Sequence, residues 1–152
     1  MPELVWNRIL DTNPDGDSPP ARGGHQLCLD EENGLLYLFG GWDGRVALAD
    51  FWVYSLTQQR WELLSGNTAD EDGPSSRSCH KMAFHPLTGH IYLLGQFPTS
   101  TIISDLSDLD SEKSSPPNDF WRYHTQGFRA GKWELISTDT SVSTAIQAID
   151  PF

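Results

Sequence analysis

The stretch LYLFGGWDGR at residues 36–45 decides the fold, because a run of large apolar residues ends there on two glycines. A second stretch, IYLLGQFPTS at residues 91–100, repeats the pattern 55 residues later, with Gln96 in place of the second glycine. Paired glycines let a buried strand turn through backbone conformations that a Cβ would penalise, and they let neighbouring chain pack close. The two stretches therefore predict two copies of one β-unit that continue into different loops.

The repetition extends beyond these stretches. Residues recur in the same order in both copies, and the offset between copies grows along the chain. The equivalent pairs are Arg22 and Arg77, His25 and His80, Tyr37 and Tyr92, and Gly40 and Gly95 at 55 residues; Asp50-Phe51-Trp52 and Asp119-Phe120-Trp121, with Tyr54 and Tyr123, at 69; and Trp61 and Trp133 at 72. The growing offset places a long insertion after Gly95 and a short one near residues 127–131.

Each copy contains four short apolar segments separated by turn residues. In the first copy they lie near residues 25–29, 35–39, 51–56 and 60–64, and Asn33-Gly34 and Thr88-Gly89 stand where hairpin turns belong. The segment at 35–39 does not alternate with polar residues, so both of its faces should be covered. Four covered strands that repeat about every 50 residues describe a β-propeller blade.

The predicted fold is therefore all-β: a partial propeller of two four-stranded blades plus one orphan strand from a preceding blade. Residues 1–19 are assigned to that strand and an acidic loop, because Trp6 precedes Arg22 by 16 residues as Trp61 precedes Arg77. Residues 20–66 form the first blade, and residues 67–137 form the second blade with a flexible insertion at 96–118. Residues 138–152 lead into a missing blade.

A chain of only two blades would leave the outer apolar faces of its sheets without a neighbouring blade to cover them. Propellers close with about 4–8 blades, so neighbouring blades normally bury those faces. Uncovered faces are association hazards. We therefore expect this chain to need missing propeller blades or to self-associate, rather than to be a well-folded monomer on its own.

The ordered motifs resemble the kelch repeat: double glycine after an apolar run, then an aromatic strand with Tyr, then Trp before the next Arg and His. The segments RGGHQLCLD, YLFGGWDG, LADFWVYS and SRSCHKM are most similar to muskelin-like kelch proteins. That resemblance implies a kelch propeller that binds other proteins. It also implies a scaffold or substrate-adaptor subunit of a CTLH-type ubiquitin ligase complex, with the other ligase subunits as partners.

Composition narrows the class of partner. A formal net charge of −11 argues against binding to nucleic acid or to an anionic membrane. No apolar run approaches the roughly 20 residues of a membrane span, and the N-terminus lacks the pattern of a secretory signal. Cys28 and Cys79 have no zinc-site spacing and are expected to be reduced and packed. We expect a cytoplasmic protein, with the nucleus as a second location.

No catalytic, cofactor-binding or metal-binding motif is found. His80, His85 and His90 are five residues apart, and this odd spacing reverses the face along a strand, so three imidazoles should not converge on one ion. An enzyme is not expected, and neither is a cofactor. The alternatives are a fragment of a kelch-type enzyme such as a copper oxidase, which would need tyrosine, cysteine and histidine converging on the ring axis, and a nonfunctional truncated product.

The candidate protein-binding loop contains Trp42, Asp43 and Arg45, because an exposed aromatic beside an arginine is typical of binding hot spots. The alternative is that Trp42 folds back over the blade edge. The acidic insertion at 96–118 is a second candidate for partner contact or regulation. The remaining repeated residues are predicted to be structural: Arg22, His25, Tyr37, Gly40, Gly41, Tyr54, Trp61, Arg77, His80, Tyr92, Gly95, Tyr123 and Trp133.

Overall fold

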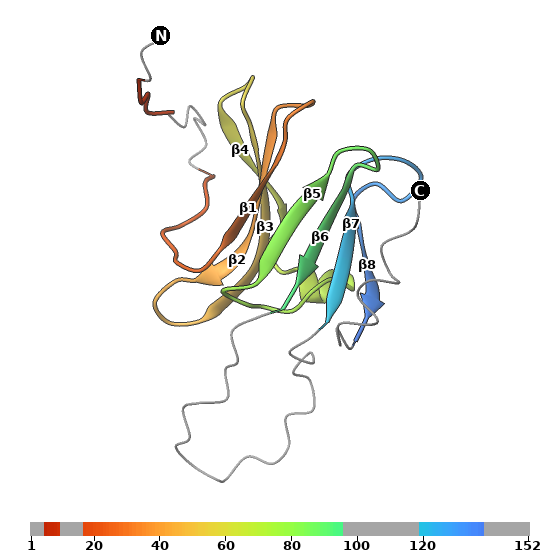
Figure 1. The fold of residues 1–152 in the computed structure, drawn as a ribbon. Coiled ribbons are helices and arrows are strands. Elements are labelled where there is room, and N and C mark those ends of the chain that lie inside the picture. Colours follow the sequence, from red (N-terminus) through yellow and green to blue (C-terminus); the bar gives the residue numbers. More distant parts are fainter. Residues whose placement is uncertain (1–4, 10–16, 96–118, 139–152) are drawn as a thin grey trace.

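A computed structural model describes residues 5–9, 17–95 and 119–138 of the chain. The structure contains two antiparallel four-stranded sheets, and in each sheet the strands follow one another in the order of the sequence (Figure 1). The first contains β1 (Gln26–Asp30), β2 (Leu35–Trp42), β3 (Ala47–Ser55) and β4 (Arg60–Ser65). The second contains β5 (Lys81–His85), β6 (His90–Leu94), β7 (Phe120–His124) and β8 (Lys132–Ser137). A 3-10 helix, η1 (Thr68–Glu71), lies between them in the chain. The prediction of two four-stranded units is confirmed.

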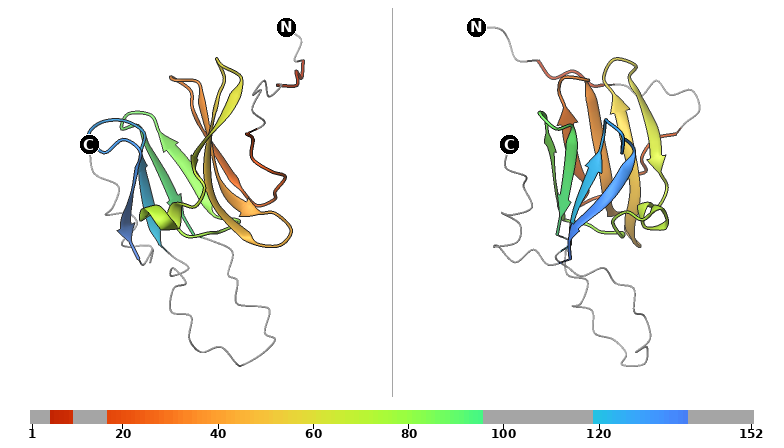
Figure 2. Two further views of the ribbon diagram at one scale, coloured as in Figure 1. Left: turned by 180° about the vertical axis from the view of Figure 1, so that it is seen from behind. Right: turned by 90° about the vertical axis from the view of Figure 1, so that its right-hand side faces the viewer.

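The two sheets pack face against face, with β1 next to β5 (Figures 1 and 2). Alternate residues of a strand point to opposite faces, and cross-strand partners share a face. The front face of the first sheet, which is defined here by Tyr37, Phe39, Phe51 and Val53, meets the back face of the second. That back face is defined by Ile91, Leu93, Trp121 and Tyr123. These eight residues belong to one buried apolar cluster.

Aromatic rings hold this junction together. Trp133 on β8 lies with its ring centroid 5.2 Å from that of Phe51 and 5.8 Å from that of Phe39. Tyr123 contacts Phe51 edge to face at 4.8 Å. Such pairs add about 0.5–1.5 kcal/mol each beyond the area they bury. Trp133, which the sequence predicts to be structural, therefore packs between the two sheets.

Close approach between the sheets explains the double glycine. Gly40 and Gly41 have φ values of 60° and 108°, and β2 carries an irregularity between Phe39 and Gly41. A Cβ on Gly40 would stand 2.7 Å from the backbone oxygen of Arg77. The Gly41 amide donates to that same oxygen at 2.9 Å, and the Arg77 amide donates to Leu48 at 3.0 Å. The segment that leads into β5 is thus hydrogen-bonded to the backbone of β2 and β3 beside the two glycines.

β2 continues through both glycines, which corrects one prediction. Trp42 was expected in a loop beyond the strand, but it is the last residue of β2 and pairs with Ala47. The strand persists because Gly41 also pairs with Leu48 across the irregularity. The turn that follows is accordingly shorter than the sequence indicates.

The predicted orphan strand is also corrected. Residues 5–9 have no regular secondary structure, and Trp6 is fully exposed rather than packed between blades. A fourth strand needs the third strand of its own blade as hydrogen-bonding partner. Both third strands that the structure describes, β3 and β7, already pair with β4 and β8.

The two cysteines differ from each other. Both are free, but only Cys28 is buried, whereas Cys79 is exposed and not packed as expected. Cys79 lies in the linker before β5 with a φ of 56°, outside a strand, which accounts for its exposure. The insertion at 96–118, which the sequence predicts to be flexible, and the tail at 139–152 lie outside the described residues, as does most of the acidic N-terminal loop. No helix among the described residues is long and apolar enough to cross a bilayer.

Candidate protein-binding loop

Residues 43–46 connect β2 to β3 in a tight, exposed turn, and together with Trp42, the last residue of β2, they are called here the loop at 42–46. The Trp42 side chain is 44% exposed, and its backbone pairs with Gly23 through two hydrogen bonds of 2.8 and 2.9 Å. Oδ1 of Asp43 accepts from the amides of Arg45 at 2.7 Å and Val46 at 2.8 Å. These bonds favour the charged carboxylate, so they lower the pKa of Asp43. Asp43 therefore shapes the turn, while Trp42 and Arg45 remain available at the surface.

An arginine on the preceding segment anchors this turn to its sheet. Arg22 binds Asp50 in a bidentate pair, with Nη1 to Oδ1 at 2.5 Å and Nη2 to Oδ2 at 2.7 Å. Arg22 Nη1 also donates to the backbone oxygen of Gly40 at 3.0 Å. Nε1 of Trp52 donates to Asp50 at 2.7 Å. The planar fork of arginine suits this arrangement, which joins the start of β1, the end of β2 and the start of the buried part of β3.

The second sheet repeats the same arrangement of arginine, aspartate and tryptophan. Arg77 binds Asp119 with Nη1 to Oδ1 at 2.5 Å and Nη2 to Oδ2 at 2.8 Å, and Trp121 Nε1 donates to Asp119 at 2.6 Å. Arg77 Nη1 also reaches the oxygen of Gly95 at 3.3 Å. Here the pair is almost completely enclosed, since the arginine side chain is 0% exposed and the aspartate 2%. We name these two groups of Arg, Asp and Trp the Arg-Asp-Trp brackets.

Sequence reasoning left Asp50 and Asp119 out of the structural set. A signal was present, because each opens an Asp-Phe-Trp triplet that recurs at the offset of the following Trp and Tyr. The carboxylate is needed by the repeated arginine, and the repeated indole supplies a further donor. The Asp-Phe-Trp triplet thus indicates an Arg-Asp-Trp bracket at the start of the buried part of the strand, rather than a purely apolar strand.

Three titratable side chains near the sheet junction, Cys28, Tyr37 and His80, are neutral at physiological pH. Burial raises the pKa of Cys28 to about 12 and that of Tyr37 to about 12. Burial, with Arg77 beside it, lowers the pKa of His80 to about 4. His80 and His25 each lie directly before a first strand, β5 or β1, rather than in it. Among the described residues, no group of three His, Cys, Asp or Glu side chains could hold a metal ion.

A family model, the KLHDC2/KLHL20/DRC7 Kelch-repeats domain, matches residues 3–148. The chain belongs to the kelch-repeat family. Its two sheets are kelch blades, and the resemblance drawn from the glycines, tyrosines and tryptophans is confirmed at the level of this family. The narrower resemblance to muskelin-like proteins stays a prediction.

Curated relatives are much longer than this chain. Mei4-dependent protein 6 of Schizosaccharomyces pombe (strain 972 / ATCC 24843) is 32% identical over 124 residues, which cover 79% of this chain and 15% of that protein. Multiple epidermal growth factor-like domains protein 8 is 29% identical over 126 residues in Mus musculus, covering 76% of this chain and 4% of that protein. In Homo sapiens it is 31% identical over 109 residues, covering 68% and 4%. The chain thus spans a small part of each relative.

Equivalent tryptophans of the two kelch blades have different contacts. Trp133 packs against the first blade, whereas Trp61 contacts Tyr54 of its own blade at 5.1 Å on the back face of the first blade. Trp52 and Trp121 are buried, at 7% and 9% exposure. On the second blade, Tyr92 stacks on Phe120 at 5.6 Å. The binding role of Trp42, Asp43 and Arg45 stays a prediction.

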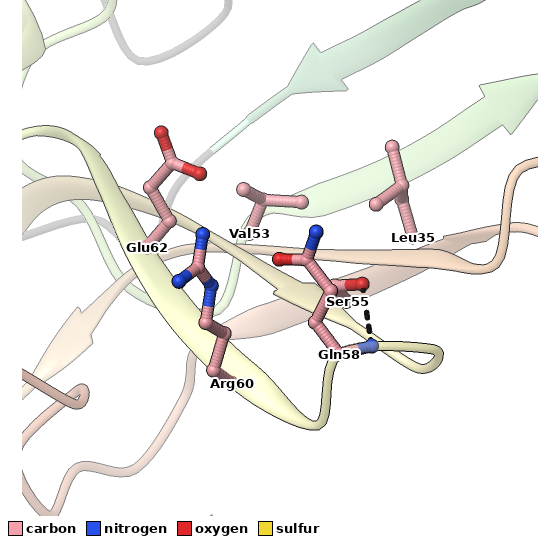
Figure 3. A pocket seen from close by; sticks show the side chains of 6 residues that line it. All are labelled: Leu35, Val53, Ser55, Gln58, Arg60 and Glu62. Carbon is pink, nitrogen blue, oxygen red and sulfur yellow. Dashed lines mark hydrogen bonds between the residues drawn. The ribbon is translucent and has the colours of Figure 1, made fainter. Parts of the chain in front are cut away.

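Two pockets occupy equivalent places on the two kelch blades. The first, of about 160 Å³, lies at the end of the blade where β3 turns into β4 (Figure 3). It is lined by Leu35, Val53, Ser55, Gln58, Arg60 and Glu62. The second, of about 380 Å³, is lined by Glu71, Asp72, His124, Arg129, Lys132, Trp133 and Glu134. Three positions are repeat-equivalent, namely Ser55 with His124, Arg60 with Lys132 and Glu62 with Glu134. Both pockets are lined by charged side chains, and neither contains the loop at 42–46.

Proposed function

We propose that this kelch chain is a non-catalytic protein-interaction module, and that the loop at 42–46 contacts its partner. The observation that carries the proposal is the exposed Trp42 beside Arg45 on a rigid support. Trp42 is 44% exposed, yet its backbone is paired on both sides, with Gly23 and with Ala47. A pre-ordered aromatic loses little conformational entropy on binding, which favours a hot spot.

The finer proposal is that the module serves a ubiquitin ligase complex of the CTLH type. Support comes from the similarity of four segments to muskelin-like kelch proteins, and from the kelch family itself. In this proposal the chain acts as a scaffold or substrate adaptor in the cytoplasm or nucleus. The loop at 42–46 then meets another subunit or a substrate.

Affinity purification of the tagged chain from cells tests both the binding role of the loop at 42–46 and the role in a CTLH-type ligase complex. We expect a ligase subunit to be recovered with the unchanged chain, and Trp42→Ala with Arg45→Ala to lose it. Arg60→Ala is the matched control, because Arg60 is an exposed arginine that lines the separate pocket on the same blade. Recovery of no ligase subunit contradicts the ligase role. Equal losses in the loop variant and the control contradict the role of the loop.

We also propose that another blade, or a second copy of the chain, covers the back face of the first blade. Leu27, Leu29 and Leu63 on that face are 44%, 46% and 45% exposed. The equivalent positions of the second blade face the aromatic front of the first, and Met82 and Phe84 there pack against the core. Light scattering of the chain, compared with a variant carrying Leu27→Ser and Leu63→Ser, tests this. A chain that stays monomeric and folded at all concentrations contradicts it.

A further inference from the structure

The hairpin turns that join the first and second strands of the two blades share a backbone shape but differ in chemistry. The turn between β1 and β2 ends in Asn33-Gly34, and the turn between β5 and β6 ends in Thr88-Gly89. The two glycines have φ values of 63° and 64°. In the second blade, Oγ1 of Thr88 lies 3.1 Å from Nδ1 of His85, the last residue of β5. The first blade places an amide side chain where the second has this hydroxyl.

An asparagine before a glycine is a chemically reactive pair. Asparagine is thermolabile because the backbone nitrogen of the next residue can attack its side-chain carbonyl carbon. Glycine obstructs this attack least, since it has no Cβ. Asn33-Gly34 is the one Asn-Gly pair in the sequence, and Asn33 is exposed to water. The other asparagines are followed by Arg8, Pro14, Thr68 and Asp119.

The reaction at this pair consumes one water molecule and exchanges no electrons. The nitrogen of Gly34 forms a bond to Cγ of Asn33, and the bond from Cγ to Nδ2 breaks. Nδ2 leaves as ammonia, taking up one proton in place of the proton that Gly34 loses, and a cyclic imide remains. Water then opens the imide at either of its two carbonyl carbons. The product is aspartate, or isoaspartate when the original backbone bond is the one that breaks.

Asp30 holds the reactive amide in the folded chain. Nδ2 of Asn33 donates to Oδ2 of Asp30 at 2.7 Å, and the backbone amide of Asn33 donates to Oδ1 at 3.2 Å. Asp30 is itself fixed, because it is 2% exposed and pairs with Leu35 at the end of β1. Hydrogen bonds to a carboxylate are stronger than neutral ones. Nδ2 can leave as ammonia only after its bond to Asp30 has broken, so the contact opposes the reaction.

The product would disturb the same contact. A carboxylate at position 33 cannot donate to Asp30, and it brings a second negative charge beside one that is almost enclosed. Two adjacent carboxylates repel each other, and a buried charge without partners is costly. Isoaspartate also adds a methylene to the backbone of the turn, which works against the register between β1 and β2. Cys28 of β1 belongs to the buried cluster between the sheets, so the effect reaches the core.

We propose that Asn33 is a deamidation site that Asp30 protects in the folded chain, and that its reaction loosens the β1–β2 hairpin of the first blade. The chain supplies the nucleophile, the nitrogen of Gly34, and water is the co-reactant. The site lies at the opposite end of β2 from the loop at 42–46 and does not depend on a partner there. The second blade carries the inert form of the turn, with Thr88 in place of the amide.

Peptide mapping by mass spectrometry tests the proposal on the 152-residue chain, incubated at mildly alkaline pH with and without urea. In urea, Asn33 should convert faster than any other asparagine, and labelling by isoaspartate methyltransferase should identify the isoaspartate. The folded chain should convert at least about tenfold more slowly, a factor that corresponds to about 1.4 kcal/mol. One hydrogen bond to a charged group is sufficient for such a factor.

Asp30→Ala should remove most of this protection in the folded chain and leave the rate in urea unchanged. Circular dichroism shows whether this variant folds. Asp30→Asn, which keeps the shape but not the charge, should give an intermediate rate and serves if the alanine variant is unfolded. Equal rates for the unchanged chain with and without urea overturn the proposal. So does faster conversion at Asn67 or Asn118 in urea.

The effect on the hairpin has its own matched variants. Asn33→Asp reproduces one product, whereas Asn33→Thr copies the second blade and adds no charge. Asn33→Asp should lower the urea midpoint relative to Asn33→Thr. The exchanged pair, Asp30→Asn with Asn33→Asp, restores one donor and one acceptor and should recover most of that loss. Equal midpoints for Asn33→Asp and Asn33→Thr overturn the proposed loosening.

Discussion

The backbone oxygen of Arg77 accepts a hydrogen bond from the Gly41 amide at 2.9 Å, and this contact ties the second kelch blade to the end of the strand that bears the double glycine. Arg77 is also the centre of the second Arg-Asp-Trp bracket. The glycine motif of one blade and the arginine of the next therefore form a single junction.

Gly40→Ala should destabilise the blade junction more than Gly95→Ala. Both glycines have positive φ, at 60° and 71°, so each alanine incurs about 1–2 kcal/mol of left-handed strain. Only at Gly40 would the new Cβ stand 2.7 Å from the Arg77 oxygen, whereas nothing described lies within 4 Å at Gly95. We expect the total for Gly40→Ala to exceed about 2 kcal/mol. Urea unfolding of both variants measures the difference, and equal midpoints would contradict this account.

Asp119→Asn should destabilise the chain strongly, by about 3–5 kcal/mol, because it leaves the enclosed guanidinium of Arg77 without its counter-charge. Asp50→Asn should have a smaller effect, since the Asp50 side chain is 13% exposed and water can replace part of the pairing. A double variant, Arg77→Leu with Asp119→Leu, should cost less than the sum of the two single changes. A double-mutant cycle in urea checks this, and additive costs would show that the bracket does not act as a unit.

His80 should make stability depend on pH on the acidic side. Burial, together with the positive charge of Arg77 and the neighbouring His25 and Lys81, lowers its pKa from 6.5 to about 4. The unfolded chain then binds more protons between these values, so this contribution is complete above about pH 6.5 and is lost as pH falls toward 4. A shift of this size corresponds to at most about 3 kcal/mol.

The test compares the free energy of unfolding of the unchanged chain and of His80→Leu across that pH range. The variant should show a flatter slope between pH 6.5 and 4. His85→Leu is the control, because that side chain is partly exposed at the end of β5. An unchanged slope in His80→Leu would show that other groups carry the acid dependence.

The sequence was sufficient for the parts of the fold that repeat. Both sheets were predicted from the apolar segments and the Asn33-Gly34 turn, because each element recurs with the same local chemistry. Trp133 was recognised as the equivalent of Trp61 although the insertions enlarge its offset. The backbone contact between the blades was not predictable, because Arg77 bonds to Gly41 across a separation in sequence that no local pattern reports. The same limit hid the end of β2 at Trp42, because the pairing of Trp42 with Ala47 depends on the register between β2 and β3.

Trp133→Ala and Trp61→Ala test whether equivalent kelch positions depend on a neighbouring blade. Trp133 lies 5.2 Å from Phe51 of the first blade and 5.0 Å from Tyr123 of its own, so its removal opens the core between the sheets. We expect a loss of about 3–5 kcal/mol for Trp133→Ala. Trp61→Ala should cost clearly less, because Trp61 contacts Tyr54 on a face that neither of the two described blades covers from outside. Urea unfolding with near-UV circular dichroism measures both, and equal losses would show that Trp61 is already packed by a second copy of the chain.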